Sequence, residues 1–424
     1  MSVRSSEFGT LNGLNEGLLA DRVLVGGVNS PVRAFRQVGG EPVLLAGAKG
    51  ATVRDDAGRT YVDFIMGWGA QILGHNPPAA VQALRRQLAA GALVGLTHPA
   101  EARLAAMIAD VVPSVEQLRF TVSGTEACMT AVKIARAHAG RSKVLVFDGC
   151  YHGHGESLMA GKSAGLPNAL SGETVSVPYN DVGAAERAIE RFGQELAAVI
   201  VEPVAANMGV VAPEPRFLMA LREFTSQRNI VLIFDEVVTG FRLGYGSAQS
   251  LVNVQTDLTT FGKIIGGGLP IGAVGGPRRL MQHLAPEGDV YHGGTFAGHP
   301  LSMAAGLAVL SALKQRPPYQ RLERLSQRLA DGLAHAARDA GVPIQVNRAG
   351  SMLTVFFSDQ PVRNAQQAKA SRRERFAQWA NALRRGGFLI PPSPFEALFL
   401  STAHTNTHID RMVRASRGAF AAMR

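Results

Sequence analysis

Short apolar runs rich in β-branched residues alternate along the chain with longer stretches of helical periodicity. The clearest strand candidates are 143–147, 198–202 and 230–234, and the helix candidates around them are 126–139, 182–191 and 215–228. Strands that are apolar on both faces and separated by helices are typical of a mainly parallel sheet covered on both sides. The pattern predicts an α/β core over roughly residues 60–300.

This alternation ends after a segment rich in Ala, Leu and Met at 301–314. Pro317 and Pro318 follow, and two consecutive prolines do not continue a helix. Beyond them lie a strand candidate at 352–357 and a terminal helix candidate near 409–423. We therefore expect three parts, which are an N-terminal segment over 1–60 that packs with the small domain, a large domain over 61–315 and a smaller α+β domain over 316–424.

Composition narrows the class of protein. The chain has 424 residues, of which 46% are hydrophobic and 18% charged, and these proportions favour a folded globular protein. No apolar run is long enough to span a membrane, and the start MSVRSSEFGTLNG lacks the apolar stretch of a signal peptide. Cys128 and Cys150 are too few for a disulfide framework, so we expect buried thiols, a reducing compartment and a cytoplasmic location without a membrane partner.

The net charge of +10 raises the question of a nucleic-acid partner. The arginines are dispersed along helical segments such as 102–111 and 321–340, and they do not form a basic block. We therefore expect no nucleic acid. A positive field equally favours a small anionic substrate or a phosphorylated cofactor.

Carboxylates close two of the predicted strands. Glu202 ends the run AAVIVE and Asp235 ends IVLIFD, and ligands of open parallel sheets bind outside the carboxyl ends of the strands. Asp235 follows a continuous apolar run, so an unpaired carboxylate there would be destabilising or would become protonated. Its partner is either the protonated pyridine nitrogen of a cofactor or a cation of the protein such as Arg242, and the segment alone favours neither.

A lysine stands before a glycine cluster in the segment GKIIGGGLP. Lys263 is followed by Ile264, Ile265 and three glycines, and desolvation in such a setting lowers the pKa of a lysine that acts as a nucleophile or forms a Schiff base. An exposed lysine before a glycine turn is the alternative. A phosphate-binding P-loop is excluded, because Asp257 stands where the first glycine is required and Ile264 where a Ser or Thr is required.

Two other segments could contact a ligand. Ser123, Gly124 and Thr125 precede a strong helix pattern, where backbone N–H groups and hydroxyls can hold an anion. The alternative is an ordinary helix N-cap without a ligand. Tyr151, in CYHGHGE, is either an aromatic platform for a ligand or part of the core.

The histidines do not form a metal site. His152 and His154 alternate along an extended segment and point to opposite sides, and no second ligand pair at zinc spacing occurs. His404 and His408 lie four residues apart, but Thr405 stands where a zinc protease requires glutamate. We expect no metal.

Six motifs occur in the order found in class III aminotransferases, namely SGTEA, GCYHGH, EPVAANMG, DEVVTGFR, GKIIGGGLPIGA and GGTFAGHP. Each motif is weak alone, but the ordered set is specific, and the chain resembles that family over roughly residues 15–420. The resemblance implies the pyridoxal-phosphate (PLP) transferase fold-type I, with a mainly parallel sheet covered by helices and a smaller α+β C-terminal domain. Within the class, GGVNSPVRAF, GWGAQILGHN and PPSPFEA are similar to segments typical of the glutamate-1-semialdehyde 2,1-aminomutases.

The resemblance implies a role for each matching residue. Lys263 would carry pyridoxal 5'-phosphate as a Schiff base and move protons, and Asp235 would bind the pyridine nitrogen. The other implied contacts are Tyr151 and Val237 on the two ring faces, Asn207 near the phenolic oxygen, Ser123, Gly124 and Thr125 at the phosphate, and Thr295 of the partner subunit, also at the phosphate. A contact from the partner subunit implies a homodimer with a shared active site.

The substrate pocket implied by the resemblance consists of Ser30, Arg33, Trp68 and Glu396, with Arg33 receiving a carboxylate. The implied activity starts from pyridoxamine 5'-phosphate and transfers an amino group within glutamate-1-semialdehyde, which gives 5-aminolevulinate for tetrapyrrole synthesis. A related class III aminotransferase or aminomutase acting on another amino compound is the alternative. A non-catalytic regulator is disfavoured, since no segment is available for a DNA-binding module.

The sequence departs from the pattern of these aminomutases at several positions, namely Val122 for a usual Asn, Ala206 for Gly, His292 for Gln, Ala297 for Ser and His299 for Asn. The last three lie near Thr295 and could change the polarity of the subunit contact. The segment between His154 and Tyr179 is also short, and it lacks the usual loop of glycine and serine. Because that loop is the lid over the site, its loss predicts leakage of the diamine intermediate and behaviour closer to that of a plain transaminase.

Overall fold

A seven-stranded sheet forms the centre of the larger lobe, in the order β4-β10-β9-β8-β7-β5-β6. The computed structural model describes residues 16–159 and 163–423. The strands are β4 (Gln117–Thr121), β5 (Lys143–Asp148), β6 (Thr174–Pro178), β7 (Leu196–Val201), β8 (Val231–Asp235), β9 (Leu258–Gly262) and β10 (Gly272–Gly276). Only β10 runs antiparallel to its neighbours, β4 and β9. The predicted mainly parallel sheet is confirmed.

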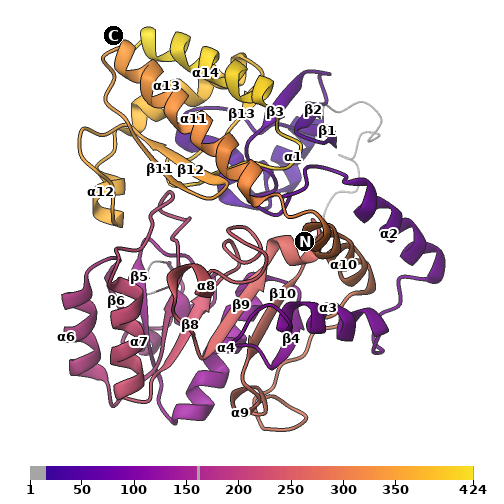
Figure 1. The fold of residues 1–424 in the computed structure, drawn as a ribbon, viewed down its shortest axis with the longest axis vertical. Helices are drawn as coiled ribbons and strands as arrows, with labels where there is room; N and C mark the ends of the chain where they lie inside the picture. The colour runs from indigo at the N-terminus through magenta and orange to yellow at the C-terminus, as the bar shows by residue number, and fades with distance from the viewer. Residues whose placement is uncertain (1–15, 160–162, 424) are drawn as a thin grey trace, which may run out of the picture.

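Helices cover both faces of this sheet (Figure 1). The helices of the larger lobe are α2 (Pro78–Ala90), α3 (Pro99–Ala109), α4 (Gly124–Ala139), α5 (Asn168–Ser171), α6 (Val182–Phe192), α7 (Phe217–Gln227), α8 (Gln249–Val252), α9 (Arg278–Met281) and α10 (Pro300–Gln315). Successive residues of β5 show why both faces are apolar. Val144 and Val146 pack in the core beneath α4, whereas Leu145 and Phe147 pack in the core beneath α6 and α7.

The smaller lobe joins the two ends of the chain. It contains α11 (Tyr319–Asp339), β11 (Gln345–Ala349), β12 (Met352–Phe356), α12 (Ala365–Lys369), α13 (Arg373–Arg385), β13 (Phe388–Leu389), β14 (Leu398–Phe399) and α14 (Asn406–Ala421). The N-terminal part supplies α1 (Glu16–Val23), β1 (Leu45–Lys49), β2 (Thr52–Asp55) and β3 (Thr60–Asp63), with the 3₁₀ turns η1 (Val25–Gly27), η2 (Pro31–Ala34) and η3 (Arg36–Val38). β13 pairs parallel with β3, and the indigo strands lie beside the orange and yellow helices in Figure 1.

The domain borders stay predictions. The predicted border at residue 60 falls inside β3, which begins at Thr60. The predicted break after 314 coincides with the end of α10 at Gln315, and Pro318 is the N-cap of α11. Residues 1–15 of the predicted N-terminal segment, with the start sequence considered above, lie outside the described residues.

The last helix begins earlier than the apolar pattern predicts. Periodicity indicated a start near Ile409, but α14 begins at Asn406. Thr405 is the cause, since its hydroxyl accepts a hydrogen bond from the backbone N–H of His408 at 3.3 Å. The cap extends the helix beyond its apolar face.

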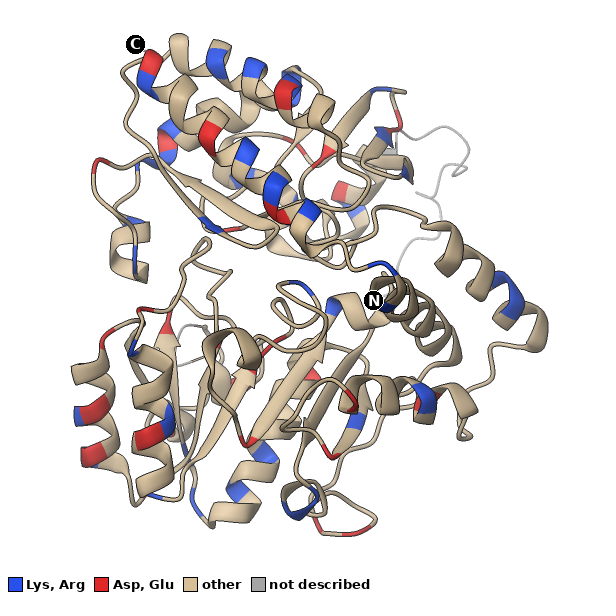
Figure 2. Cartoon of the chain, viewed as in Figure 1, with Lys and Arg blue, Asp and Glu red and all other residues tan. Residues whose placement is uncertain are grey.

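Acidic residues stand among the more numerous basic residues of α11, α13 and α14 in the smaller lobe (Figure 2). Arg328 on α11 binds Asp410 on α14 at 2.7 Å, and Arg417 lies 3.7 Å from Asp339. The basic side chains are thus dispersed among carboxylates, as the sequence indicated. Within the described ranges, no helix is long and apolar enough to cross a membrane.

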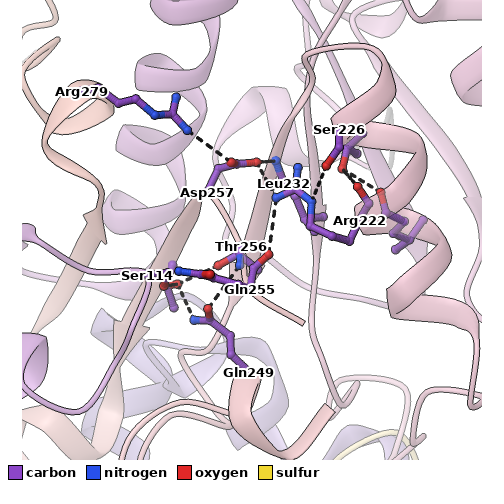
Figure 3. Close-up of polar contacts among 12 residues, drawn as sticks. Ser114, Arg222, Ser226, Leu232, Gln249, Gln255, Thr256, Asp257 and Arg279 are labelled. Atoms are coloured by element: carbon purple, nitrogen blue, oxygen red, sulfur yellow. Dashed lines mark hydrogen bonds and ion pairs between the residues drawn. The ribbon is translucent and has the colours of Figure 1, made fainter. Parts of the chain in front are cut away.

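At the amino ends of β8 and β9, one carboxylate ties two helices to the sheet (Figure 3). Oδ2 of Asp257 accepts hydrogen bonds from Nη1 of Arg222 on α7 at 2.9 Å and from the backbone N–H of Leu232 at 2.8 Å. Nη2 of Arg279 on α9 lies 3.7 Å from Oδ1. Helices from opposite faces therefore share one anchor on the sheet.

Replacing Asp257 should lower the stability of the fold and leave the far, carboxyl ends of the parallel strands unaffected. We expect Asp257→Ala to lower the free energy of unfolding by about 1–3 kcal/mol, because a backbone N–H and a guanidinium lose their acceptor. Urea unfolding measures the loss. Asp410→Ala is the matched control, and its smaller loss should reflect an exposed ion pair. Equal losses in the two variants would contradict the anchoring role.

Candidate active site

A cavity of about 510 Å³ lies at the carboxyl ends of the parallel strands, where loops of both lobes meet. All but one of the predicted site residues line it, namely Ser30, Arg33, Trp68, Ser123, Gly124, Thr125, Tyr151, Asn207, Asp235, Val237, Lys263 and Glu396. Thr295 is the exception, since it is exposed and lies outside the cavity lining. The fold thus brings together residues that lie more than 360 positions apart, from Ser30 to Glu396.

Asp235 ends β8 with its carboxylate only 4% exposed, and histidine is its closest partner. Oδ2 lies 2.7 Å from Nδ1 of His152, and Oδ1 accepts the backbone N–H of Val237 at 3.0 Å. Burial alone would raise the pKa of Asp235, but the hydrogen bond and charge of His152 outweigh it and lower that pKa. The alternative of an ion pair with Arg242 is wrong, because that guanidinium binds other groups.

Two more side chains approach the same carboxylate. Sγ of Cys128, on α4, lies 3.4 Å from Oδ2 of Asp235, and the hydroxyl of Thr260, on β9, lies 3.3 Å from Oδ1. Sequence reasoning missed these two residues and His152 as partners of Asp235. They come from three different elements, and no local pattern relates them.

The CYHGHGE segment separates its two histidines as predicted, since His152 is buried and His154 is exposed. Nε2 of His152 is buried and has no hydrogen-bond partner among the described residues. Tyr151 is 52% exposed and lines the cavity, so the alternative that it packs in the core is wrong. Cys150 is only half-buried, unlike the predicted buried thiol, whereas Cys128 is buried.

Lys263 follows β9 in a strained conformation, at the start of η5 (Lys263–Gly266). Its φ of 47° is unusual for a residue with a side chain, and such strain is typical of functional sites. The lysine is half-buried, and burial lowers its pKa, although the negative charges of Asp235 and Glu202 oppose that effect. A lysine with a lowered pKa has a larger fraction of the neutral, nucleophilic amine.

The glycines after Lys263 serve packing. At Gly267 a Cβ would lie 2.6 Å from the backbone oxygen of Ala305, so the absence of a side chain lets α10 approach η5 closely. Gly267 also has a φ of 60°. The motif therefore brings a helix against the lysine loop, and it is not a phosphate cradle.

The N-terminus of α4 is open to the cavity. The Ser123 hydroxyl accepts the backbone N–H of Glu126 at 3.2 Å, so Ser123 is the N-cap of α4. The first N–H groups of a helix have no acceptor within the helix, and those of Gly124 and Thr125 are in this position. At Gly124 a Cβ would lie 2.9 Å from Val237, so only glycine lets this turn approach the valine so closely. The turn is suited to an anion.

Glu202, which follows β7, organises one wall. Its carboxylate accepts the backbone N–H of Tyr151 at 2.9 Å, the backbone N–H of Ala206 at 2.9 Å and the side-chain amide of Asn207 at 3.0 Å. Burial and then the charge of Asp235 raise the pKa of Glu202. Sequence reasoning found Glu202 at a strand end but gave it no role. The structure places it behind two predicted cofactor contacts.

Another part of the cavity combines an exposed cation, Arg33, with a carboxyl group of raised pKa, that of Glu396. Arg33 is exposed in η2, whereas Trp68 and Glu396 are half-buried. Burial raises the pKa of Glu396 to about 7, although the nearby Lys263 lowers it. Glu396 is therefore close to half ionised at neutral pH.

Two of the departures noted in the sequence can be placed. Val122 lines the cavity beside Ser123. His299 caps α10, since its Nδ1 accepts the backbone N–H of Leu301 at 3.2 Å. Histidine therefore supplies a helix cap at a position where the usual asparagine could also supply one.

The described residues contain no group of three His, Cys, Asp or Glu side chains that could hold a metal ion. His404 is buried by packing against Phe64, with ring centroids 4.6 Å apart, and its Nδ1 accepts the backbone N–H of Ser401. His404 and His408 contact each other edge to face, and neither belongs to such a group.

Residues 36–414 match the family described as Aminotransferase class-III. The chain belongs to the class III aminotransferase family. It is 48% identical over 410 residues to a glutamate-1-semialdehyde 2,1-aminomutase of Desulfosudis oleivorans, with 94% of this chain and 96% of that protein covered. It is 47% identical over 409 residues to the aminomutase of Aquifex aeolicus, again with 94% and 96% covered.

Solved structures with the same fold include both aminomutases and transaminases. An omega-transaminase from Sphaerobacter thermophilus has a TM-score of 0.89 and 36% identity, with 96% of each chain covered. A glutamate-1-semialdehyde aminomutase from Pseudomonas aeruginosa has a TM-score of 0.85 and 27% identity, with 95% of this chain and 93% of that chain covered. A further structure of the Pseudomonas enzyme is a complex with pyridoxamine phosphate (PMP). These likenesses confirm the predicted fold class.

Ionisation of Glu396 should make anion binding depend on pH. Because its pKa is about 7, Glu396 gains a negative charge as the pH rises through neutrality, so the affinity for a dicarboxylate such as glutarate should fall by up to about tenfold. Titrations followed by Trp68 fluorescence at pH 6 and pH 8 measure the change. Glu396→Gln should remove it, whereas the control Glu223→Gln, on the exposed surface of α7, should retain it. A pH step that survives in Glu396→Gln would assign it to another group.

Proposed function

We propose that this protein is a PLP-dependent aminomutase that converts glutamate-1-semialdehyde into 5-aminolevulinate by moving an amino group within the substrate. The observation that carries the proposal is one cavity that combines the strained Lys263, the buried Asp235 and an open helix N-terminus. Identity of 47–48% to aminomutases over 94% of the chain supports this substrate over others.

The residues of the cavity fit the parts of PLP. Asp235 offers a buried carboxylate of lowered pKa, which suits a protonated pyridine nitrogen. Gly124 and Thr125, with the Ser123 turn, offer N–H groups to a phosphate, and Lys263 offers an amine. Tyr151 and Val237 line the cavity where the two faces of a planar ring would need apolar contacts. Bound PLP supplies the electron sink and exchanges an amino group with a carbonyl.

The protein's own contribution is to hold the substrate and move protons. Nζ of Lys263 is the group that accepts a proton from the reacting carbon and returns it, a role that typically contributes about 10²–10⁴-fold in rate. Glu202 fixes Asn207 and the backbone of Tyr151, so the ring wall does not shift while protons move. Glu202 and Asn207 thus orient the reacting groups, and Lys263 alone exchanges protons with the substrate in this proposal.

The other half of the cavity suits a carboxylate-bearing amino aldehyde. Arg33 supplies a guanidinium for bidentate contact with the carboxylate, and Ser30 lies on the same turn. Glu396 faces Lys263 and can hold an amino group when it is ionised. Trp68 closes the pocket on the substrate side.

A second copy of the chain completes the proposed site. Loop 291–298, which contains Thr295, carries the exposed rings of Tyr291 and Phe296, 75% and 55% exposed. It lies against the start of α3, where a Cβ on Gly298 would be 2.5 Å from Oε2 of Glu101. The loop that precedes α3 exposes the side chains of Leu93 and Leu96. Apolar residues exposed this densely mark a subunit interface, so we propose a homodimer in which Thr295 of the partner subunit reaches the phosphate.

Neither cysteine forms a disulfide bond, which supports a reducing compartment, and we propose a cytoplasmic location on that basis. Nothing in the proposed reaction requires a membrane or a nucleic acid. The proposed partners are the small anionic substrate, PLP or PMP, and a second copy of the chain.

A related transaminase is the alternative, and the short segment between His154 and Tyr179 favours it. That segment contains η4 (Glu156–Leu158) and α5 and leads into β6, while residues 160–162 lie outside the described residues. A shorter segment over the site would retain the diamine intermediate less well between the two half-reactions of an aminomutase. The two functions differ in whether an external amino donor is needed.

Incubation with glutamate-1-semialdehyde alone separates the two functions. We expect the purified, PMP-loaded protein to form 5-aminolevulinate over many turnovers without an added donor or acceptor, because the amino group returns to the same molecule. Chromatography of the products measures 5-aminolevulinate and any released diamine. A single turnover that stops with released diamine would instead identify a transaminase and assign a functional cost to the short segment.

Removing the anchor lysine should abolish covalent attachment of the cofactor. In Lys263→Ala we expect no cofactor to be retained after borohydride reduction, and turnover to fall by at least about 10²-fold. Mass spectrometry of the reduced protein measures the attachment. Lys133→Ala, on the exposed side of α4, is the control and should keep both properties. Covalent cofactor in Lys263→Ala would place the anchor elsewhere.

A further inference from the structure

Arg242 is a buried cation with neutral partners. It is 1% exposed, and among the described residues it forms no ion pair with a carboxylate. Its guanidinium donates to the backbone oxygens of Gly69 and Leu400 at 2.5 and 2.9 Å and to the hydroxyl of Ser351 at 3.1 Å. Burial lowers the pKa of Arg242 to about 9. A buried charge without an ionic partner costs free energy of folding, so the contacts of Arg242 require a functional explanation.

The first of these contacts ends a strained turn. Met66, Gly67, Trp68 and Gly69 have φ values of 47°, 59°, 56° and 91°, four consecutive residues in the left-handed region. Two of them carry large side chains, for which this conformation is unfavourable. Such a turn persists only where its surroundings hold it, and Nη2 of Arg242 binds the last carbonyl of the turn. The turn directs Trp68 into the lining of the cavity.

The other contacts of Arg242 lie at the ends of β14 and β12. Leu400 directly follows β14, and the guanidinium carbon lies 5.4 Å from the ring centroid of Phe399, which lines the cavity. That ring also closes on the turn, since a Cβ on Gly69 would lie 2.8 Å from it. Ser351 precedes β12 in the same sheet of the smaller lobe. One guanidinium therefore links the Trp68 turn to the Phe399 wall.

We propose that Arg242 is a positioning residue that sets substrate affinity by holding the turn that carries Trp68 against Phe399, without touching the substrate itself. Arg242 is absent from the cavity lining, yet its guanidinium contacts Phe399, which lines the cavity, and binds the carbonyl of Gly69, the residue after Trp68. The planar fork of arginine reaches three acceptors in different directions, which the single ammonium of a lysine does not. The inference rests on the proposed function only for the identity of the substrate.

Fluorescence tests the positioning without any substrate. The chain has two tryptophans, and Trp379 is fully buried, so iodide quenching of the holoenzyme reports on Trp68. In Arg242→Met we expect the quenching constant of Trp68 to rise at least about twofold, because the turn loses its anchor and relaxes. Arg242→Lys should give an intermediate rise.

Kinetics with glutamate-1-semialdehyde test the consequence for the substrate. A displaced pocket wall should raise KM by about 10- to 100-fold in Arg242→Met, with a smaller change in kcat. The cofactor content after borohydride reduction should stay as in the parent protein, since Arg242 touches none of the proposed cofactor contacts. If glutamate-1-semialdehyde is not a substrate, KM cannot be measured with it. Iodide quenching of Trp68 then still shows whether Arg242 positions the turn.

Arg141 supplies a matched control. Its Nη1 also donates to three backbone oxygens, those of Gly193, Leu196 and Arg228, at a place remote from the cavity lining. Arg141→Met should lower the melting temperature but leave both Trp68 quenching and KM unchanged. This separates loss of positioning from general loss of stability.

If Arg242→Met does not fold, Arg242→Lys and Ser351→Ala decide the question. Ser351→Ala removes one acceptor and leaves the other two, so a small rise in Trp68 quenching is expected. Unchanged quenching and KM in the folded Arg242 variants would overturn the proposal, as would equal changes in Arg141→Met.

Discussion

The site depends on keeping one carboxylate ionised in the interior of the protein. Asp235 ends a strand that is buried along its whole length, and burial by itself would favour the neutral acid. Donors from four directions oppose this, namely His152 after β5, Cys128 on α4, Thr260 on β9 and the N–H of Val237 in its own turn. A parallel sheet is what brings these elements together, because the loops after its strands meet at one edge.

Around this carboxylate, burial shifts the other ionisable groups toward their neutral forms. Burial raises the pKa of both Glu202 and Glu396, and burial lowers the pKa of Lys263. The pKa of Asp235 thus shifts in the opposite direction to those of Glu202 and Glu396, because Asp235 alone among these three carboxyl groups has a histidine at 2.7 Å. Pairs of groups whose environments separate their pKa values in this way are typical of acid–base catalysis. The arrangement suits a fixed charge at one end of a ligand and mobile protons at the other.

Apolar runs in the sequence were sufficient to predict the sheet and to place Asp235 at a strand end, whereas the roles of Asp235 and Lys263 came from the ordered family motifs and stay predictions. The partners of Asp235 had no local signature. His152 lies 83 positions away and Cys128 107 positions away, so only the folded chain shows that they converge. The same limit applies to Arg242, which a local argument paired with the nearby Asp235, whereas its actual acceptors are 109 to 173 positions away. The early start of α14 depended on a single capping hydroxyl that apolar periodicity does not register.

The two halves of the cavity therefore have different origins and different freedom to change. The proposed cofactor half consists of strand ends and the start of α4, which the sheet itself fixes. The proposed substrate half consists of the turns at 30–33 and 66–69 and of the segment 396–400, of which only the last contributes a strand, β14, to a sheet. A class of enzymes that shares one backbone but accepts different amino compounds must vary mainly in this second half. Turns that are not held to one another would not define a pocket. Arg242 hydrogen-bonds the carbonyls of Gly69 and Leu400 and is placed to hold two of these segments together. Because Arg242 lies outside the cavity lining, the residues that line the pocket can change while Arg242 still holds these segments together.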